Sequence, residues 1–262
     1  MPRAEAGASR TNGRTGAQAV TACARCPLRR LACFDDYAAD RVSFIQTLKI
    51  GELHIGTDAE IIPEGAHGGH LYTLLSGWAF RFKTLSDGRR QILNFLLPGD
   101  FIGLQQKMAA DATHGVTALT EVRLCVFPRD SLWEIHRSFP DIAYDVTWLA
   151  AHEEALVDEV LLSVGRRNAA ERIAILLLLL HKRAMSLQLG DADNTVPFPV
   201  TQQHIADALG LSLVHTNKTL RRLEATGLHR IRGGRLSLPK PDALASLADY
   251  YARSAGAPRP LI

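Results

Sequence analysis

Residues 44–127 are punctuated by turn signals at short and regular intervals. Between them run short apolar or alternating segments, such as WAFRFK at residues 78–83. The turn signals are Pro63-Glu64-Gly65, Ser76-Gly77, Asp87-Gly88 and Pro98-Gly99-Asp100. Strands separated by turns every 8–12 residues or about that are typical of an antiparallel roll or sandwich. We therefore predict an antiparallel β-roll, which we place at residues 41–137.

The pattern changes after this region, because residues 138–162 lack glycine and contain proline only near their start. Small and β-branched side chains then recur at alternating intervals of four and three residues, which is the spacing of a heptad seam. The seam residues are Val146, Ala150, Glu153, Val157, Val160 and Val164. We predict a dimerisation helix at residues 138–165, with packing of the same stripe on its own sheet as the alternative. Glu153 either sets the register or indicates a different phase.

Residues 166–250 are assigned to a winged helix-turn-helix domain. Thr201 is expected to cap a first short helix, which Gly210 ends in a left-handed turn, and Ser212 is expected to cap a second. Two short strands flanking Gly233-Gly234 would form a wing. The inner face of the second helix is expected to carry Leu213, Val214, Leu220 and Leu223. Two capped helices joined by a short turn with glycine are the spacing of a helix-turn-helix.

Charge supports a nucleic-acid partner for this domain. The chain has a net charge of only +3. Residues 200–240 nevertheless carry seven basic side chains and only two acidic ones, Asp207 and Glu224. Such a local basic patch suits contact with phosphate groups. The alternative is a solvent-exposed helix face without a binding role. We expect the start of the second helix to read base edges and its flanks to hold phosphate. The base-reading candidates are His215, Asn217 and Lys218; the other DNA-binding candidates are Thr201, Gln202, Ser212, Thr216, Arg221, Arg222 and Arg235.

Cysteines are few and unevenly placed. Cys23, Cys26 and Cys33 lie within TACARCPLRRLACF, and Cys125 lies far downstream in RLCVFP. No secretory pattern precedes them, and the longest apolar run, residues 173–180, is too short to cross a bilayer. We therefore expect a cytoplasmic protein without a membrane partner, in which cysteines are metal ligands or free thiols rather than disulfides.

The remaining segments carry less information. Residues 1–20 are small and polar and are expected to be a disordered tail, residues 21–40 form a cysteine-rich sensor segment, and residues 251–262 a second tail. His67 and His70 are better explained by a polar hairpin turn than by a metal site. Neither a glycine-rich dinucleotide loop nor a His-Glu-x-x-His motif is present, so we expect no enzyme.

A β-roll, a long helix and a winged helix-turn-helix in this order resemble the Crp/Fnr family of bacterial transcription regulators. The resemblance covers residues 21–250 or thereabouts and is closest to the oxygen-sensing fumarate-nitrate reduction branch. It is carried by YTLLSGWAFRFKTLSDGRRQILNFLLPGDFIG, LLSVGRRNAAERIAILLLLL and TQQHIADALGLSLVHTNKTLRRLEATGL. It implies a homodimer on a pseudo-palindromic site in double-stranded DNA, RNA polymerase as a further partner, and a signal sensed by the front half.

The resemblance also implies a cofactor. The oxygen-sensing branch holds a [4Fe-4S] cluster on three N-terminal cysteines and one at the end of the roll, which here match Cys23, Cys26, Cys33 and Cys125. Six residues separate Cys26 from Cys33, one more than in the best-known member. A tetrahedral zinc ion and free thiols without a metal remain the alternatives. We expect the intact cluster to favour the DNA-binding dimer.

A cyclic nucleotide is not expected in the roll. The cyclic-AMP branch of the family uses a Gly-Glu pair for the ribose and an arginine followed by a small hydroxyl residue for the phosphate. Here Gly103 is followed by Leu104, and His114-Gly115-Val116 occupies the second place. A cyclic phosphate would therefore lose its bidentate charged partner.

Overall fold

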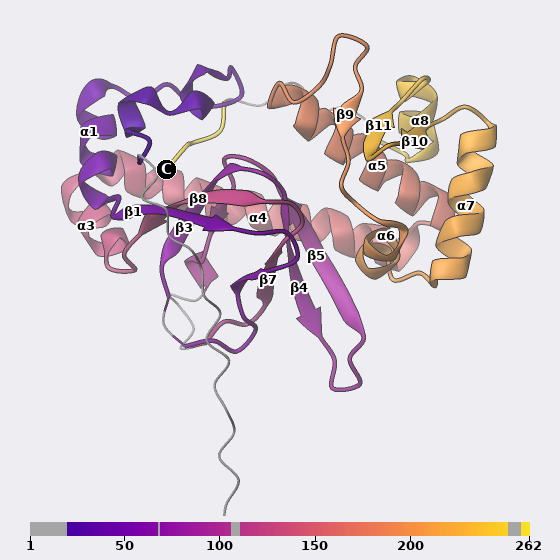
Figure 1. Ribbon diagram of the computed structural model, residues 1–262, viewed down its shortest axis with the longest axis horizontal. Coiled ribbons are helices and arrows are strands. Elements are labelled where there is room, and N and C mark those ends of the chain that lie inside the picture. Colours follow the sequence, from indigo (N-terminus) through magenta and orange to yellow (C-terminus); the bar gives the residue numbers. More distant parts are fainter. Residues whose placement is uncertain (1–19, 68, 106–110, 251–257) are drawn as a thin grey trace, which may run out of the picture.

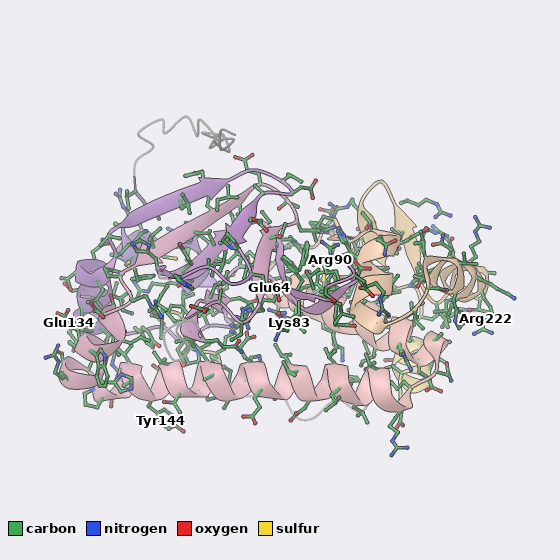
Figure 2. The ribbon with its side chains drawn as sticks, turned by 90° about the horizontal axis from the view of Figure 1, so that it is seen from below. Glu64, Lys83, Arg90, Glu134, Tyr144 and Arg222 are labelled. Carbon is green, nitrogen blue, oxygen red and sulfur yellow. The ribbon has the colours of Figure 1, made fainter. Side chains whose placement is uncertain are left out.

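The computed structural model describes residues 20–67, 69–105, 111–250 and 258–262. A sheet-rich front half and a helical back half lie along one long helix, α4 (Pro140–Arg166), as Figures 1 and 2 show. The fold class predicted from the sequence is confirmed: an antiparallel roll, a long helix and a winged helix-turn-helix. The predicted tail at residues 1–20 lies outside the described residues except for its last position.

The described residues of the front half form the cysteine segment, the roll and short helices that flank it. The segment forms the 3-10 turns η1 (Cys23–Arg25) and η2 (Pro27–Arg30), and helices α1 (Ala39–Leu48) and α3 (Ser131–Ser138) flank the roll. The strands are β1 (Gly51–Ile55), β2 (Glu60–Ile62), β3 (Leu71–Ser76), β4 (Ala79–Thr84), β5 (Arg90–Leu96), β6 (Phe101–Ile102), β7 (Gly115–Ala118) and β8 (Val122–Phe127).

The roll consists of two antiparallel four-stranded sheets, in the orders β1-β8-β3-β6 and β2-β7-β4-β5. Leu74 of β3 lies opposite Leu124 of β8, and both are fully buried in the core between the sheets. The Asp87-Gly88 signal does join β4 to β5, with Gly88 at a φ of 85° that favours glycine. The alternation of the sequence thus places one face of each strand inside the roll.

Helix α4 begins where the sequence predicts, since Pro140 lies in its first turn and lacks the N–H that a helix interior would need. Its first half packs on the roll through Ile142, Val146 and Leu149, which are at most 7% exposed. Glu153 also faces the roll and pairs with Arg81. The stripe that was predicted to face a second copy therefore packs largely within its own chain in this half of the helix.

Three apolar side chains in the second half of α4 are exposed, and one of them, Val157, belongs to the predicted seam. Val157, Leu161 and Leu162 are 48%, 69% and 48% exposed. Ala150 is exposed as well, whereas Val160 and Val164 are half-buried. The roll thus covers part of the predicted seam, at Val146 and Glu153, while Ala150 and Val157 stay exposed, and pairing of this stripe with a second copy stays a prediction.

The back half is a compact winged helix-turn-helix. Its helices are α5 (Ala169–Ser186), α6 (Gln202–Leu209), α7 (Leu213–Ala225) and α8 (Pro241–Leu247), and its strands are β9 (Val196–Pro197), β10 (Arg230–Arg232) and β11 (Arg235–Ser237). Asn168 begins α5 with a capping box closed by Glu171. Gly233 and Gly234, at φ of 57° and 70°, make the tight turn of the wing.

The two halves are in direct contact. Arg90 of β5 pairs with Asp207 of α6 at 2.9 Å, and Gln91 donates a hydrogen bond to the carbonyl of Ala208 at 2.9 Å. Figure 2 shows Arg90 at the boundary between the roll and the helical domain. Within the described ranges, no helix combines the length and the apolar character needed to cross a bilayer.

Candidate functional site

Helix α7 is positioned by the caps of α6 and α7 and by the turn between the two helices. Thr201 caps α6 by accepting from the His204 backbone N–H at 3.2 Å, and Ser212 caps α7 by accepting from the His215 N–H at 3.2 Å. Between them Gly210 adopts φ 63° and ψ 37°, the left-handed conformation that ends α6 and redirects the chain. Thr201, Gly210 and Ser212 thus fix where α6 ends and where α7 begins, and so set the orientation of α7.

One face of α7 is exposed and cationic. His215, Lys218, Arg221 and Arg222 are all exposed, and their spacing of three and four residues places them on one side of the helix. Figure 2 shows Arg222 at the end of the molecule far from the roll, directed outward. Among the described residues, Lys218, Arg221 and Arg222 have no acidic partner within ion-pair distance. This face has the shape and charge of a major-groove reader.

The burial of two α7 side chains, Thr216 and Val214, differs from the prediction. Thr216 was expected to hold phosphate, but it is 0% exposed and faces the helix core beside Leu220. Val214 was expected inside, but it is 79% exposed. Positions 216 and 219 lie one helical turn before Leu220 and Leu223 and therefore share their buried face. This four-residue spacing indicates burial of Thr216 and exposure of Val214. Asn217 is half-buried.

Val214 joins the candidate surface as a result. It lies in the first turn of α7 with His215 and Lys218 on the same side. An apolar side chain at the start of a reading helix can contact the methyl group of thymine, the one apolar feature of base edges in the major groove. Val214, His215 and Lys218 are thus exposed together near the start of α7, and base contact by them stays a prediction.

The wing is held in place by ion pairs. Arg235 pairs with Asp191 and donates to the Thr195 carbonyl at 2.8 Å, which fastens β11 to the loop before β9. Arg232 pairs with Glu224 of α7 at 2.7 Å. Arg235, a predicted phosphate contact, is thus half-buried and engaged within its own domain.

A second candidate site is the pocket around three of the cysteines, which we name the cysteine pocket. It is lined by Cys23, Cys26 and Cys125 together with apolar side chains from α1 and β3, and leaves a cavity of ≈ 40 Å³. Lys49 and Glu52, with side chains 1% and 4% exposed, form an ion pair at 2.8 Å beside it. Glu52 also accepts from the Thr21 N–H at 2.8 Å, so this pair ties the start of the cysteine segment to the roll.

Burial dominates the electrostatics of this pocket. Burial raises the pKa of the Cys125 thiol to about 11, against a smaller lowering by Lys49, and it also raises the pKa of Cys23. Burial alone would raise the pKa of Glu52, but hydrogen bonds from Lys49 and Arg123 bring it down to about 2. Burial thus disfavours the thiolate forms of Cys23 and Cys125, which are the forms that ligate a metal.

Cys33 does not join the other three cysteines. It lines no part of the cysteine pocket, and the charged group that acts on it is Arg259. Across residues 20–67, 69–105, 111–250 and 258–262, no group of three or more His, Cys, Asp or Glu side chains is placed to hold a metal ion. A [4Fe-4S] cluster takes four cysteine thiolates. As the side chains lie, they do not fit the predicted cluster.

The roll and α4 are joined at a third site. Arg81 of β4 pairs with Glu153 at 2.5 Å and donates to the Phe101 carbonyl at 3.0 Å, and Asn94 donates to the same Glu153 oxygen at 3.0 Å. A small cavity of ≈ 80 Å³ beside this pair is also lined by Gly103, Leu104 and His114. An internal carboxylate thus already engages the arginine that an anionic ligand of this cavity would need.

His114 gives this site a pH dependence. Burial, helped by Arg81 and Lys83, lowers the pKa of His114 to about 4. The pKa of His114 is lower in the folded state than in the unfolded state. The stability contributed by neutral His114 is therefore fully present above about pH 6.5 and is lost as the pH falls toward 4. We expect urea unfolding at pH 4–7 to show a loss of up to about 3 kcal/mol that His114→Gln removes. The exposed-site variant His54→Gln should keep the wild-type pH profile; an unchanged profile in His114→Gln would contradict the assignment.

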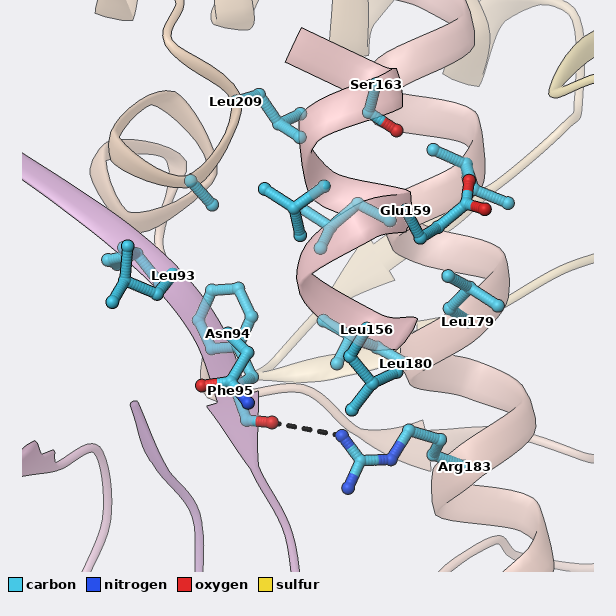
Figure 3. A pocket seen from close by; sticks show the side chains of 15 residues that line it. Leu93, Asn94, Phe95, Leu156, Glu159, Ser163, Leu179, Leu180, Arg183 and Leu209 are labelled. Atoms are coloured by element: carbon cyan, nitrogen blue, oxygen red, sulfur yellow. Dashed lines mark hydrogen bonds between the residues drawn. The ribbon is translucent and has the colours of Figure 1, made fainter. Parts of the chain in front are cut away.

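An apolar pocket lies where the roll, α4, α5 and α6 meet (Figure 3). Leu156 of α4, Leu180 of α5 and Leu209 of α6 line its ≈ 90 Å³ together with β5. At its edge Arg183 donates to the Phe95 carbonyl at 3.0 Å, the bond drawn in Figure 3. The helical domain therefore packs on the roll through apolar contacts, with the Arg183 hydrogen bond at one side of the interface.

The fold and the exposed cationic helix together define a regulator that binds DNA through a helix-turn-helix. Residues 52–139 match the cyclic nucleotide-binding domain, and residues 171–247 match the Crp-like helix-turn-helix domain. The chain belongs to the Crp/Fnr family of transcription regulators, which are not enzymes.

Several relatives cover most of the chain. The nitrogen fixation regulation protein FixK of Bradyrhizobium diazoefficiens is 30% identical over 86% of this chain and 93% of its own length. The transcriptional activatory protein AadR of Rhodopseudomonas palustris is 32% identical over 84% and 92%. The fumarate and nitrate reduction regulatory protein of Salmonella typhimurium is 25% identical over 69% and 71%. The solved structure of FixK2 from Bradyrhizobium japonicum superposes with a TM-score of 0.68 at 28% identity, covering 78% of this chain and 98% of that one.

Proposed function

We propose that the chain is a homodimeric transcription regulator that binds a pseudo-palindromic duplex site, and that its front half decides when it binds. The observation that carries this proposal is the unpaired cationic face of α7, with His215, Lys218 and Arg221 exposed on one side. A second copy would place a second such helix on the DNA, about one helical turn away. We also propose RNA polymerase as a partner of the bound dimer.

The dimer proposal rests on α4. Val157 and Leu161 lie four residues apart on one exposed side of a helix that links the two halves, and Leu162 is exposed beside Leu161; exposed apolar side chains grouped in this way are typical of an interaction surface. Val157 continues the predicted heptad seam, which fits pairing with the same helix of a second copy.

A charge placed on this exposed side tests the dimer. Leu161→Glu should weaken self-association by at least about tenfold, because two buried carboxylates would then meet at the interface. Sedimentation should show the 28.7 kDa chain as a monomer where the wild type is a dimer. The matched control is Leu85→Glu, a leucine 57% exposed in the β4–β5 turn of the roll. A Leu161→Glu chain as dimeric as this control would refute the interface.

For the signal we propose oxygen or redox state, read by the cysteine segment. Two observations support this: Cys23, Cys26 and Cys125 share one pocket in the front half, and relatives of this chain include the fumarate and nitrate reduction regulatory protein. The four cysteines do not fit a [4Fe-4S] cluster as they lie, so no step of the proposal passes through one. Cluster binding would require Cys33 to move into the cysteine pocket.

Iron and acid-labile sulfide analysis of chain purified without air separates these possibilities. The arrangement described above predicts no bound iron and four reactive thiols after denaturation, since the sequence holds four cysteines. Four irons and four sulfides per chain, as a [4Fe-4S] cluster requires, would show instead that a different arrangement exists in solution.

A second candidate signal is a small ligand in the roll, with no metal involved. It is favoured by the cavity between Arg81, His114 and Glu153, which lies where the roll meets α4. An anion there would compete with Glu153 for Arg81 and so loosen the roll from the helix that carries the proposed dimer face.

A further inference from the structure

The last five described residues, 258–262, return from the helical domain to the cysteine segment. The Arg259 N–H donates to the Cys33 carbonyl at 2.9 Å, and the Asp35 N–H donates to the Arg259 carbonyl at 2.9 Å. These two bonds make a short parallel bridge between Phe34 and Arg259. Figure 1 shows the yellow C-terminal end running beside the indigo start of the chain. We name residues 258–262 the C-terminal strap.

The end of the C-terminal strap is buried in the cysteine pocket. Leu261 and Ile262 are 8% and 6% exposed and line this pocket with Cys23, Cys26 and Cys125. Thr73 of β3 donates its hydroxyl hydrogen to the Ile262 carbonyl. Removing two aliphatic side chains of this size from water is favourable. Burial of Leu261 and Ile262 therefore favours binding of the strap in the pocket.

Arg259 fixes the strap at its other end. Its guanidinium pairs with Asp100 at 2.8 Å and lies 5.7 Å from the centre of the Phe34 ring. Asp100, whose side chain is 2% exposed, also pairs with Arg183 of α5 at 2.6 Å. One buried carboxylate thus joins the roll, the helical domain and the C-terminal strap.

We propose that the cysteine pocket is a receptor for this chain's own C-terminal peptide. The apolar pair Leu261-Ile262 fills it, and Arg259 anchors the peptide by charge. Leu261 and Ile262 line the same pocket as Cys23, Cys26 and Cys125, and a cavity of only ≈ 40 Å³ is left beside them. The pocket therefore holds either the strap or a bulky group bound to its three thiols, and not both at once.

The inference is tested by the rate at which the thiols react with N-ethylmaleimide, followed residue by residue by mass spectrometry. The probes are the full chain, a chain ending at residue 257, Ile262→Asp and Arg259→Ala, with Arg137→Ala on α3 as the control for loss of an exposed arginine. We expect Cys26 and Cys125 to react at least about tenfold faster in the three strap variants, because exposure governs thiol reactivity. The control should match the wild type.

A peptide added in trans separates docking from unfolding. The pentapeptide of residues 258–262, PRPLI, should restore slow labelling to the truncated chain, and a scrambled peptide of the same composition should not. Equal labelling rates in all variants, or no protection by PRPLI, would overturn the proposal. If the truncated chain does not fold, Ile262→Asp decides the question, with urea unfolding to confirm its fold. The readout involves no DNA, so a failed test leaves the DNA-binding proposal standing.

Discussion

Replacing Lys218 and Arg221 together by alanine should reduce affinity for a specific duplex site by about 100-fold or more. Both side chains are exposed on the same face of α7, with Lys218 nearer its start. A lost base contact costs about 1–3 kcal/mol, and a lost phosphate contact lowers the salt slope of binding by about one. Fluorescence anisotropy over a range of salt concentrations measures both effects on one labelled duplex.

The control for this pair is Arg137→Ala, an exposed arginine on α3 in the front half. It removes a positive charge of the same kind far along the chain from α7 and should leave the affinity within about twofold, because exposed charges far from the bound DNA are largely screened at physiological salt. Binding by the Lys218→Ala, Arg221→Ala chain equal to that of the control would show that α7 does not read DNA. A uniform loss in both variants would indicate non-specific steering by net charge.

Asp100→Asn should be the most destabilising conservative change in the front half. The carboxylate is 2% exposed, and its charge is shared by Arg183 and Arg259 at 2.6 and 2.8 Å. Burial would raise the pKa of Asp100, but the two guanidinium groups hold it well below its usual range. The amide leaves both arginines without a counter-charge, which costs about 3–5 kcal/mol when a buried pair is broken.

Urea unfolding of Asp100→Asn against Asp87→Asn measures this effect. Asp87 pairs with Arg89 at 2.8 Å on the surface, where the side chains are 52% and 77% exposed, so its loss should cost less than about 1 kcal/mol. A free energy of unfolding that falls equally in the two variants would contradict the role of Asp100 as the common anchor of roll, helical domain and strap.

The local rules of the chain predicted much of this architecture. Turn glycines such as Gly88 and Gly210 adopt the positive φ that their positions require, and the caps Thr201 and Ser212 begin their helices as expected. Backbone conformation at turns and caps depends on a few neighbouring residues, so a sequence reveals it without knowledge of the rest of the fold.

Features that depend on distant contacts were predicted less well. The roll covers the α4 stripe at Val146 and Glu153, which heptad spacing alone did not reveal, because the spacing does not distinguish a sheet of the same chain from a second copy as the packing partner. The burial of Ile262 had no local signal at all, since its partners lie more than a hundred residues away in the chain. The family resemblance implied four cysteine ligands around one site, whereas the structure places three of the cysteines in one pocket together with Leu261 and Ile262.

The most direct test of the account is a footprint of the purified full-length chain on duplex DNA selected from a random pool, in low-salt buffer, with and without air. We predict protection of two symmetric half-sites about one helical turn apart, weakened steeply by salt. Absence of a protected site under both conditions would contradict the central claim that α7 reads DNA.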